Sequence, residues 1–490
     1  MLTKKVGFSR ANMVIVMKVQ EDAVCGEIFQ RRNKGLRRTN MGDDLLTQMR
    51  REAVDIFKAS VEAVDPVEAV RRFVKVDGER LSVGAAGGKR VDMDLSRFER
   101  VLVVGGGKAT APMARAVEDL LGARIHEGLI NVKYGFTQDL SHTRVTEAGH
   151  PIPDQSGVEG TRKILSLLDE AGEKDLIFSL ISGGGSALLP QPAGRITLAE
   201  KQEMTRQLLA CGATIDEINA LRKHISLSKG GQMARLAYPA TTVNLMLSDV
   251  VGDKVDVIAS GPFTPDPATY GEVWGILRKY KLEDIPGAIR THLEGGLEGK
   301  VPETPKPGDR VFGRVTNIVV GSNILALEAA REEAEKLGYQ TLILSSQVEG
   351  ETREVALVHT AIAKEALTTG RPLPPPACII SGGETTVTLK GQGLGGRNQE
   401  FCLAAALDLA GAPHRVVLLS GGTDGNDGPT DAAGAVVDPG TMNRGEAGGM
   451  RASDFLEDND AYHFFEKTGE LLMTGPTKTN VMDVRLILVR

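Results

Sequence analysis

The sequence VLVVGGGKATAPMARAVEDLL, at residues 101–121, decides the fold class of this chain. A short apolar run rich in valine ends in glycines and is followed by a stretch with helical periodicity. The same order of strand and glycine turn returns at DLIFSLISGGGS, residues 175–186, and a third strand, TTVNLMLSDV, occupies residues 241–250. Short, continuously apolar strands that alternate with helices indicate a parallel sheet covered on both faces. We therefore predict an α/β protein.

The length of 490 residues exceeds what one hydrophobic core usually serves, so two domains are expected. Residues 295–313 are rich in proline and glycine, lack periodicity and have the composition of a linker or a long surface loop. The strand-then-helix order resumes at residues 317–339. We place a first α/β domain at residues 41–312 and a second at residues 313–490.

The first forty residues are basic and irregular, and Met41 opens an amphipathic helix. We interpret residues 1–40 as an over-called start or a disordered leader. A targeting peptide is the alternative, although Glu21, Asp22 and Glu27 are unusual for a transit peptide, which is poor in acids.

Composition and charge exclude several classes of protein. The net charge is −6, and no basic stripe interleaved with aromatic residues is present, so we expect no nucleic-acid partner. No apolar run approaches the roughly 18 residues needed to span a bilayer, so we expect no membrane anchor. The four cysteines are far apart and form no CxxC pair, which favours a reducing cytoplasm over a disulfide framework or a zinc site. They are Cys25, Cys211, Cys378 and Cys402.

The tripeptide SGG recurs at Ser182, Ser381 and Ser420, each time after a predicted strand. Ligands of open α/β sheets bind beyond the carboxyl ends of the strands, so these loops suggest one glycine-lined site. Glycines that merely permit tight turns are the alternative.

The SGGGS loop has the composition of a phosphate-binding loop, because several backbone N–H groups could point at one anion. We predict that it binds phosphate, and its candidate residues are Gly183, Gly184, Gly185 and Ser186. A nucleophile elbow is not supported, since Leu188 stands where that motif needs its last glycine.

Lys108 lies on the glycine loop of the opening sequence, which matches neither of two familiar nucleotide-binding motifs. A dinucleotide fingerprint fails because Thr110 occupies its third glycine position and the strand that ends near Lys133 lacks the expected acid. A Walker A loop fails because Ala109 replaces its Ser/Thr. A lysine on a glycine loop can still reach carboxylate or phosphate oxygens, and we predict that role.

Cations also gather in NALRKHISLSKGGQMA, residues 219–234, which contains Arg222, Lys223, His224 and Lys229. Paired cations suit a polyanionic ligand. A solvated basic helix face is the alternative, and we favour it slightly for Lys223 and His224.

Candidate acids follow two strands. Asp249 comes directly after the strand at 241–247, where a carboxylate can hold Mg²⁺, accept a proton from a hydroxyl or cap the next turn. Asp424, Asp427 and Asp431 crowd into SGGTDGNDGPTDAAGA, residues 420–435. This is not an EF-hand, since Gly428 and the twelfth residue, an alanine, stand where ligands are required. These acids are candidates for an Mg²⁺–nucleotide site or a general base, and Asp431 is the one that best suits a turn-former.

Arg397 follows two glycines in GQGLGGRNQE, residues 391–400, at a predicted helix start. A guanidinium there can take a carboxylate or a phosphate bidentately.

Together these motifs resemble the class II glycerate kinase family, which carries a C-terminal MOFRL domain and bears hydroxypyruvate reductase as an older label. The resemblance covers residues 41–490. It rests on GGGKA (105–109), GHPIPD (149–154), SGGGSALL (182–189), LRKHISLSKGG (221–231), SDVVGD and ASGPF (248–263), SGGETTVT (381–388), GGRNQE (395–400), SGGTDGNDGPTDAAGA and GPTKTNVMD (475–483).

The resemblance implies an N-terminal Rossmann-like domain, a C-terminal MOFRL-type α/β domain, and phosphorylation of the 2-hydroxyl of D-glycerate by ATP and Mg²⁺ in the cleft between them. In matching positions, Lys108, Asp249, Arg397 and Asp424 look like the site residues of the family. Lys478 stands where GPT-x-TN often has glycine, and we expect this departure to leave the chemistry untouched.

Several alternatives remain open from the residues. The chain could be an NAD(P)H-dependent hydroxypyruvate reductase, although the failed fingerprint argues against it, or a non-catalytic protein that binds small anions. The residues alone do not choose between the C2 and C3 hydroxyls of glycerate, and a homo-oligomer is possible. They also leave open whether Asp249 or Asp424 orients the hydroxyl and which of Asp249, Asp424 and Asp427 holds the metal.

Overall fold

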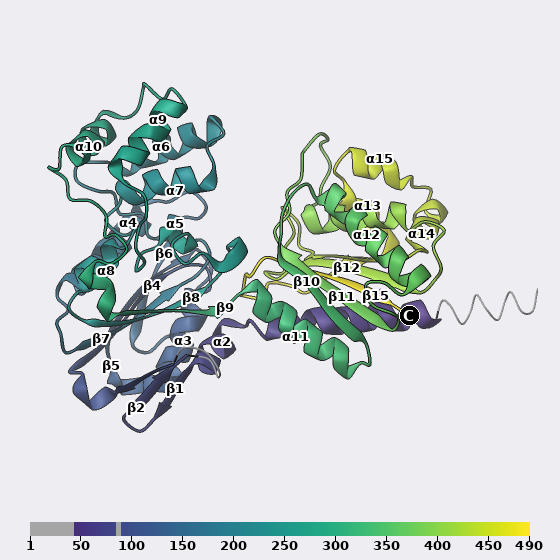
Figure 1. Ribbon diagram of the computed structural model, residues 1–490, viewed down its shortest axis with the longest axis horizontal. Helices are drawn as coiled ribbons and strands as arrows, with labels where there is room; N and C mark the ends of the chain where they lie inside the picture. Colours follow the sequence, from purple (N-terminus) through teal and green to yellow (C-terminus); the bar gives the residue numbers. More distant parts are fainter. Residues whose placement is uncertain (1–43, 85–89) are drawn as a thin grey trace, which may run out of the picture.

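The computed structural model describes residues 44–84 and 90–490, so the predicted leader at residues 1–40 and Cys25 lie outside the described residues. Two six-stranded sheets organise the chain, and each is covered by helices on both faces. Figure 1 shows them side by side as two layered domains. A small antiparallel sheet, in the order β1-β2-β3, adjoins the first domain at β1 (Val74–Asp77), β2 (Arg80–Val83) and β3 (Val91–Asp94).

The first sheet has the strand order β6-β5-β4-β7-β8-β9, and all its pairs are parallel. Its strands are β4 (Arg100–Gly106), β5 (Ile125–Lys133), β6 (Thr143–Ala148), β7 (Asp175–Ile181), β8 (Thr241–Leu247) and β9 (Val315–Gly321). Every residue of β7 is buried, as expected for a strand covered on both faces. The predicted Rossmann-like α/β architecture is confirmed.

Alternate residues of β4 belong to opposite faces of this sheet, because side chains of a strand alternate in direction. Val101 and Val103 pack with the helices of one face, whereas Leu102 and Val104 pack with those of the other. Helices α2 (Pro66–Phe73) and α3 (Thr110–Leu121) cover the first face, and α4 (Gln155–Asp169) and α8 (Gln232–Ala237) cover the second.

A layer of helices with its own apolar core stands apart from the sheet, at the upper left of Figure 1. It consists of α6 (Leu198–Ala210), α7 (Ile215–His224), α9 (Tyr270–Lys279) and α10 (Gly287–Leu297). Thr197, Thr214 and Thr269 form capping boxes that fix where α6, α7 and α9 begin.

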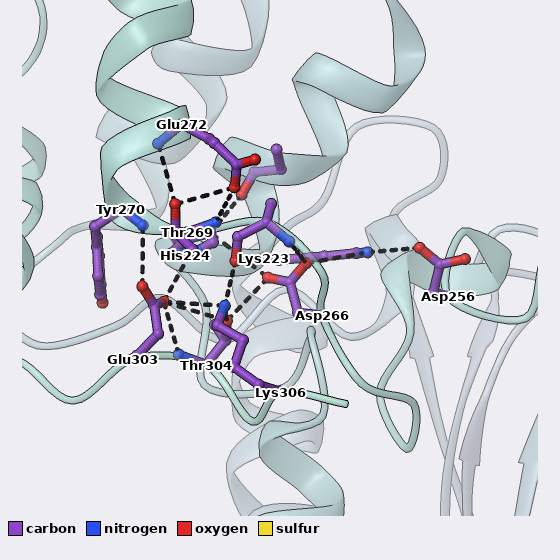
Figure 2. Close-up of polar contacts among 12 residues, drawn as sticks. Lys223, His224, Asp256, Asp266, Thr269, Tyr270, Glu272, Glu303, Thr304 and Lys306 are labelled. Atoms are coloured by element: carbon purple, nitrogen blue, oxygen red, sulfur yellow. Dashed lines mark hydrogen bonds and ion pairs between the residues drawn. The ribbon is translucent and has the colours of Figure 1, made fainter. Parts of the chain in front are cut away.

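The proline-rich stretch at residues 295–313 does not link the two domains, and of the two predicted alternatives only a long loop remains. Glu303 accepts a hydrogen bond from His224 at 2.8 Å, and the buried Thr304 hydroxyl donates to Asp266 at 3.0 Å. Figure 2 shows how these contacts fasten the stretch to the helical layer. Composition could not reveal the packing, because the partners lie far away in the sequence.

The next strand, β9, then pairs with β8 in the first sheet, so the sheets divide after Gly321 and not at residue 312. The second sheet has the order β10-β11-β15-β12-β13-β14, with β10 and β11 parallel and the other pairs antiparallel. Its strands are β10 (Gln340–Val348), β11 (Ala377–Gly383), β12 (Val416–Gly422), β13 (Gly434–Val437), β14 (Leu471–Leu472) and β15 (Asp483–Val489). The C-terminal α/β prediction is thereby confirmed.

Helices cover both faces of the second sheet. On one face α11 (Asn323–Lys336) shares a core with Ile380 and Leu486. On the other, Ile379 and Ile487 pack against the helices that complete the chain. These are α12 (Thr352–Thr369), α13 (Arg397–Asp408), α14 (Thr441–Ala447), α15 (Ala452–Glu457) and α16 (Ala461–Thr468).

The helix described over residues 44–62 also belongs to the second sheet, although it precedes the first domain in sequence. Figure 1 shows it in purple along that sheet, beside α11. Its Arg50 guanidinium contacts the buried carboxylates of Asp438 at 2.6 Å and Glu470 at 3.1 Å. Glu52 pairs with Arg490 at 3.0 Å. The domain predicted at residues 41–312 is therefore corrected at both ends.

Within residues 44–84 and 90–490, no helix is long and apolar enough to cross a membrane. The cysteines of this part of the chain, Cys211, Cys378 and Cys402, are unpaired.

We expect Arg50→Met to destabilise the protein by about 1–3 kcal/mol, because Asp438 and Glu470 lose a partner while buried. Arg444 still pairs with both acids and limits the loss. Urea denaturation would measure this as a lower midpoint. As a control, Arg71→Met removes two exposed pairs, with Glu68 and Asp119, and should leave the midpoint unchanged. Equal midpoints for Arg50→Met and the wild type would show that the helix is not anchored this way.

Candidate active site

The glycine loops after β4 and β7 lie against each other, because these strands are parallel neighbours. The backbone N–H of Lys108 donates to the Gly183 carbonyl at 2.8 Å, and that of Ala109 donates to the Ser182 hydroxyl at 2.9 Å. Lys108 thus stands at the carboxyl end of the sheet, where the sequence placed it.

Two glycines of the SGGGS loop allow unusually close packing. A Cβ at Gly183 would lie 2.1 Å from Oδ2 of Asp249, so only glycine lets the loop meet that carboxylate. Gly184 has φ +86°, and a Cβ there would lie 2.9 Å from the His150 ring and 3.3 Å from Cγ of Lys108. Lys108, His150 and Asp249 therefore surround one short loop.

Burial and neighbouring charges shift the pKa values of Asp249 and His150. Burial raises the pKa of Asp249, Asp424 raises it further, and Lys108 opposes the rise. Burial together with Lys108 and Lys133 lowers the pKa of His150 to about 4, so this imidazole is neutral at pH 7. His150 belongs to the motif GHPIPD but was not predicted as a site residue. Its position beside Lys108 depends on loops that are far apart in the chain.

A cavity of about 440 Å³ lies between the two domains at this point. Lys108 and Gly183 line it from the first domain, and Asp424 lines it from the loop after β12. Lys133 and Lys478 add two further cations to its wall. Lys478 lies on a backbone with φ +63°, and the expectation that it leaves the chemistry untouched stays a prediction.

The remaining SGGGS residues face a neighbouring cavity or are used by the fold. Gly184 and Ser186 line a cavity of about 730 Å³. The Ser186 hydroxyl lies 2.9 Å from that of Ser260. The Gly185 N–H donates to the Ser182 carbonyl at 3.2 Å, so this group is not free for a ligand, contrary to our prediction for Gly185.

Arg397 begins α13 but is already engaged by two acids. Its Nε and Nη2 donate to the two oxygens of Asp483, both at 2.8 Å, and its Nη1 lies 3.0 Å from Glu384. Burial lowers the pKa of this guanidinium, but Asp483 outweighs that effect and raises it overall. Asp483 is fully buried, whereas the Glu384 side chain is 45% exposed, so only Glu384 could be readily displaced by an anion.

Sequence reasoning missed Asp483 and Glu384 as partners of Arg397. Both were visible as acids at strand ends, in GPTKTNVMD and SGGETTVT, but their pairing depends on the register of β11 with β15, which sets Gly383 opposite Asp483.

Asp427 is a helix cap, which corrects its place among the metal candidates. Its oxygens accept the backbone N–H groups of Asn398 at 3.1 Å and Gln399 at 2.8 Å, at the start of α13. Burial raises its pKa to about 7, while these two donors oppose the rise. Asp431 is exposed and accepts from the Tyr462 hydroxyl at 2.8 Å.

Within the described ranges, no group of three or more His, Cys, Asp or Glu side chains could together hold a metal ion. Asp249 and Asp424, one from each domain, remain as candidate metal ligands. Mg²⁺ is usually held by one or two carboxylates together with phosphate oxygens and water, so a pair suffices.

Comparison with known proteins matches this arrangement. A model described as a domain of unknown function (DUF4147) matches residues 52–294, and the MOFRL family model matches residues 377–483. The glycerate 2-kinase of Pyrococcus horikoshii is 40% identical, over 88% of this chain and 95% of its own length.

The chain belongs to the glycerate 2-kinase family.

The family resemblance predicted from the sequence is therefore confirmed. The crystal structure of the glycerate kinase of Thermotoga maritima superposes with a TM-score of 0.81 at 38% identity, and covers 91% of this chain and 100% of that one. A protein of Agrobacterium vitis named putative hydroxypyruvate reductase is 42% identical over 80% of this chain and 87% of its own length. A relative of this chain thus still bears the older family label, hydroxypyruvate reductase.

We expect Asp427→Ala to destabilise the protein by about 1–3 kcal/mol, because it leaves two buried N–H groups of α13 without an acceptor. The urea midpoint measures the change, and Asp431→Ala is the matched control on the same loop. If Asp427→Ala kept its stability but lost activity, the capping role would be wrong and a role in the chemistry would be restored.

Proposed function

We propose that this family member is a glycerate 2-kinase, which transfers the γ-phosphoryl group of ATP to the 2-hydroxyl of D-glycerate and yields 2-phosphoglycerate and ADP. The observation that carries the proposal is the interdomain cavity, in which Lys108 and Asp424 of different domains face one space. The names of the relatives from Pyrococcus horikoshii and Thermotoga maritima support the position of transfer. The unpaired cysteines of the described chain fit the cytoplasm, where we place the enzyme.

In this proposal, the oxygen of the 2-hydroxyl attacks the γ-phosphorus, the bond from that phosphorus to the β,γ-bridging oxygen breaks, and ADP leaves. The hydroxyl proton passes to Asp249, whose carboxylate lies against Gly183 and whose pKa burial raises. The Lys108 ammonium lies on the loop that touches Gly183 and stabilises the migrating phosphoryl oxygens. Such a reaction needs positioning and charge neutralisation more than covalent help.

The carboxylates of Asp249 and Asp424 fit Mg²⁺. They come from different domains, and the charge of Asp424 helps to raise the pKa of Asp249. A divalent cation between them would relieve that repulsion. When bound, Mg²⁺ would neutralise the negative charge of the phosphates.

Arg397 is less free to bind a ligand than the sequence implied, because two acids already contact it. Because Nε and Nη2 of Arg397 both donate to Asp483, only Nη1 of the guanidinium contacts Glu384. We propose that the carboxylate of glycerate takes the place of Glu384 at this nitrogen. Burial raises the pKa of Glu384, Arg397 opposes the rise, and Asp483 and Asp249 raise it further.

Two features of the first sheet disfavour the rival reductase. Thr110 is fully buried where a dinucleotide fingerprint needs its third glycine, and β5 ends at Lys133 without an acid for a ribose.

We expect purified protein with ATP, Mg²⁺ and D-glycerate to release ADP, and NMR of the product to show the phosphate on C2. NADH with hydroxypyruvate should give no oxidation. Phosphate on C3 would overturn the regiochemistry, whereas NADH oxidation without ADP release would favour the reductase.

Lys108→Ala should lower kcat by at least about 100-fold, because it removes the cation nearest the transferred group. Lys174→Ala, which removes an exposed lysine paired with Glu99, is the control and should keep the wild-type rate. Circular dichroism would confirm that both variants fold. A wild-type rate for Lys108→Ala would exclude Lys108 from the reaction.

A further inference from the structure

Beside the interdomain cavity lies the second cavity, of about 730 Å³, which the residues of the reaction described above leave unused. Four lysine and arginine side chains line it. Arg206 is paired with Glu203, and we call the other three the cation triad: Lys201 from α6, Arg222 from α7 and Lys229 from the loop after α7. Lys201 and Lys229 are almost fully buried, with 6% and 1% exposure.

The cation triad has no carboxylate partner among the described residues. The Nζ of Lys201 donates to the Pro190 carbonyl at 3.0 Å, and the Nζ of Lys229 is buried without any hydrogen-bond partner. The one acid in the cavity lining, Glu203, is held by the Arg206 guanidinium at 2.6 Å. Buried charges are normally paired, so an unpaired group of cations indicates a missing anion.

The neighbouring cations of the same motif provide the contrast. Lys223 pairs with Asp256 at 3.2 Å and Asp266 at 3.4 Å, and His224 binds Glu303 at 2.8 Å. Figure 2 shows these pairs within the helical layer. Lys223 and His224 are thus structural, while their neighbour Arg222 faces the cavity. Within the described part of the chain, Lys223 and His224 are paired with acids, whereas the adjacent residue of α7, Arg222, is not.

Mutual repulsion within the cation triad supports a polyanion. Burial and Arg222 lower the pKa of Lys201 to about 7. Burial, Lys201 and Arg222 lower the pKa of Lys229 well below its usual value. A ligand with several negative charges would offset this repulsion for all three side chains at once.

The shape of the cavity suggests what else the ligand carries. Ile152 and Leu209, which are 70% and 62% exposed, lie in its lining with Pro151 and Pro153. Apolar side chains beside a cluster of cations suit a molecule with a flat apolar part and a charged part. Glycerate has no such apolar part and would fill only a fraction of the space.

The two cavities are lined by consecutive residues of the SGGGS loop. Gly183 lines the interdomain cavity and the next residue, Gly184, lines this one. Gly184 packs against both His150 and Lys108. A phosphate chain held by the cation triad could therefore reach Lys108 past this glycine.

We propose that this cavity is the nucleoside triphosphate site, in which the cation triad binds the phosphate chain and Ile152 and Leu209 contact the base. The inference rests on the proposed kinase function and assigns the donor and the acceptor to different cavities. D-glycerate then occupies the interdomain cavity alone.

Calorimetric titration with a non-hydrolysable ATP analogue and Mg²⁺, without glycerate, tests the site directly. Lys229→Met and Arg222→Met should each raise the Kd by at least about tenfold. Lys163→Met, which removes an exposed lysine on α4, is the control and should change it less than about twofold. Lys229→Met replaces a buried Nζ that has no hydrogen-bond partner among the described residues, so its Tm should be equal to or above that of the wild type. If it fails to fold, Lys201→Met takes its place.

Steady-state kinetics separates this inference from the kinase proposal. The variants should raise the KM for ATP and leave the KM for D-glycerate unchanged. An unchanged ATP Kd, or a raised glycerate KM with an unchanged ATP KM, would overturn the nucleotide site while the kinase proposal stands. Loss of analogue binding in the variants of a protein that makes no phosphoglycerate would support the site and reject the kinase proposal.

Discussion

The loops after β4 and β7 touch through backbone hydrogen bonds, and this contact sets the distance between all the groups that follow. Lys108 donates to Gly183, and Gly183 has no side chain, so Asp249 approaches from β8 on the other side of the same loop. Any larger residue at Gly183 would push the carboxylate away from the lysine. A cation, a carboxylate and two cavities are thus organised by about five residues of glycine-rich backbone.

The second domain supplies its part of the site through a buried acid. Asp483 accepts two hydrogen bonds from Arg397, one from Asn398 and one from Arg485, and lies at the start of β15 in the middle of the sheet. The orientation of α13 therefore depends on the register of β15. Asp427 holds the same helix from a different loop. Through these contacts Arg397 and the loop that carries Asp424 and Asp427 are tied to the second sheet.

Sequence predicted the strands and glycine loops of both domains because they are local patterns. β4, β7 and β12 fall where short apolar runs end in glycine, and Lys108, Asp249 and Asp424 do lie together. The prediction for Asp427 was wrong because the sequence of a glycine loop does not show whether its acid caps a helix or faces a cavity. Its role depends on α13, which begins about thirty residues earlier in the chain.

The errors in domain limits have a similar origin. Proline-rich composition suggested a linker, but Glu303 and Thr304 find partners in residues nearly eighty and forty positions away. The cation triad forms only where two helices and a loop meet. Arg222 lines the cavity, whereas Lys223, its neighbour on the same helix, pairs with Asp256. Such distinctions arise from packing between distant segments, which a sequence pattern does not show.

The position of the helix at residues 44–62 means that the backbone passes between the domains twice, once before α2 and once after β9. The two passages are close together, since a Cβ at Gly321 would lie 4.0 Å from that of Ala69. Two adjacent covalent connections act as a double-stranded hinge: they favour rotation about one axis and oppose twisting or sliding. No single cut of the chain would release either half intact, so limited proteolysis should yield nicked but associated protein and not free domains.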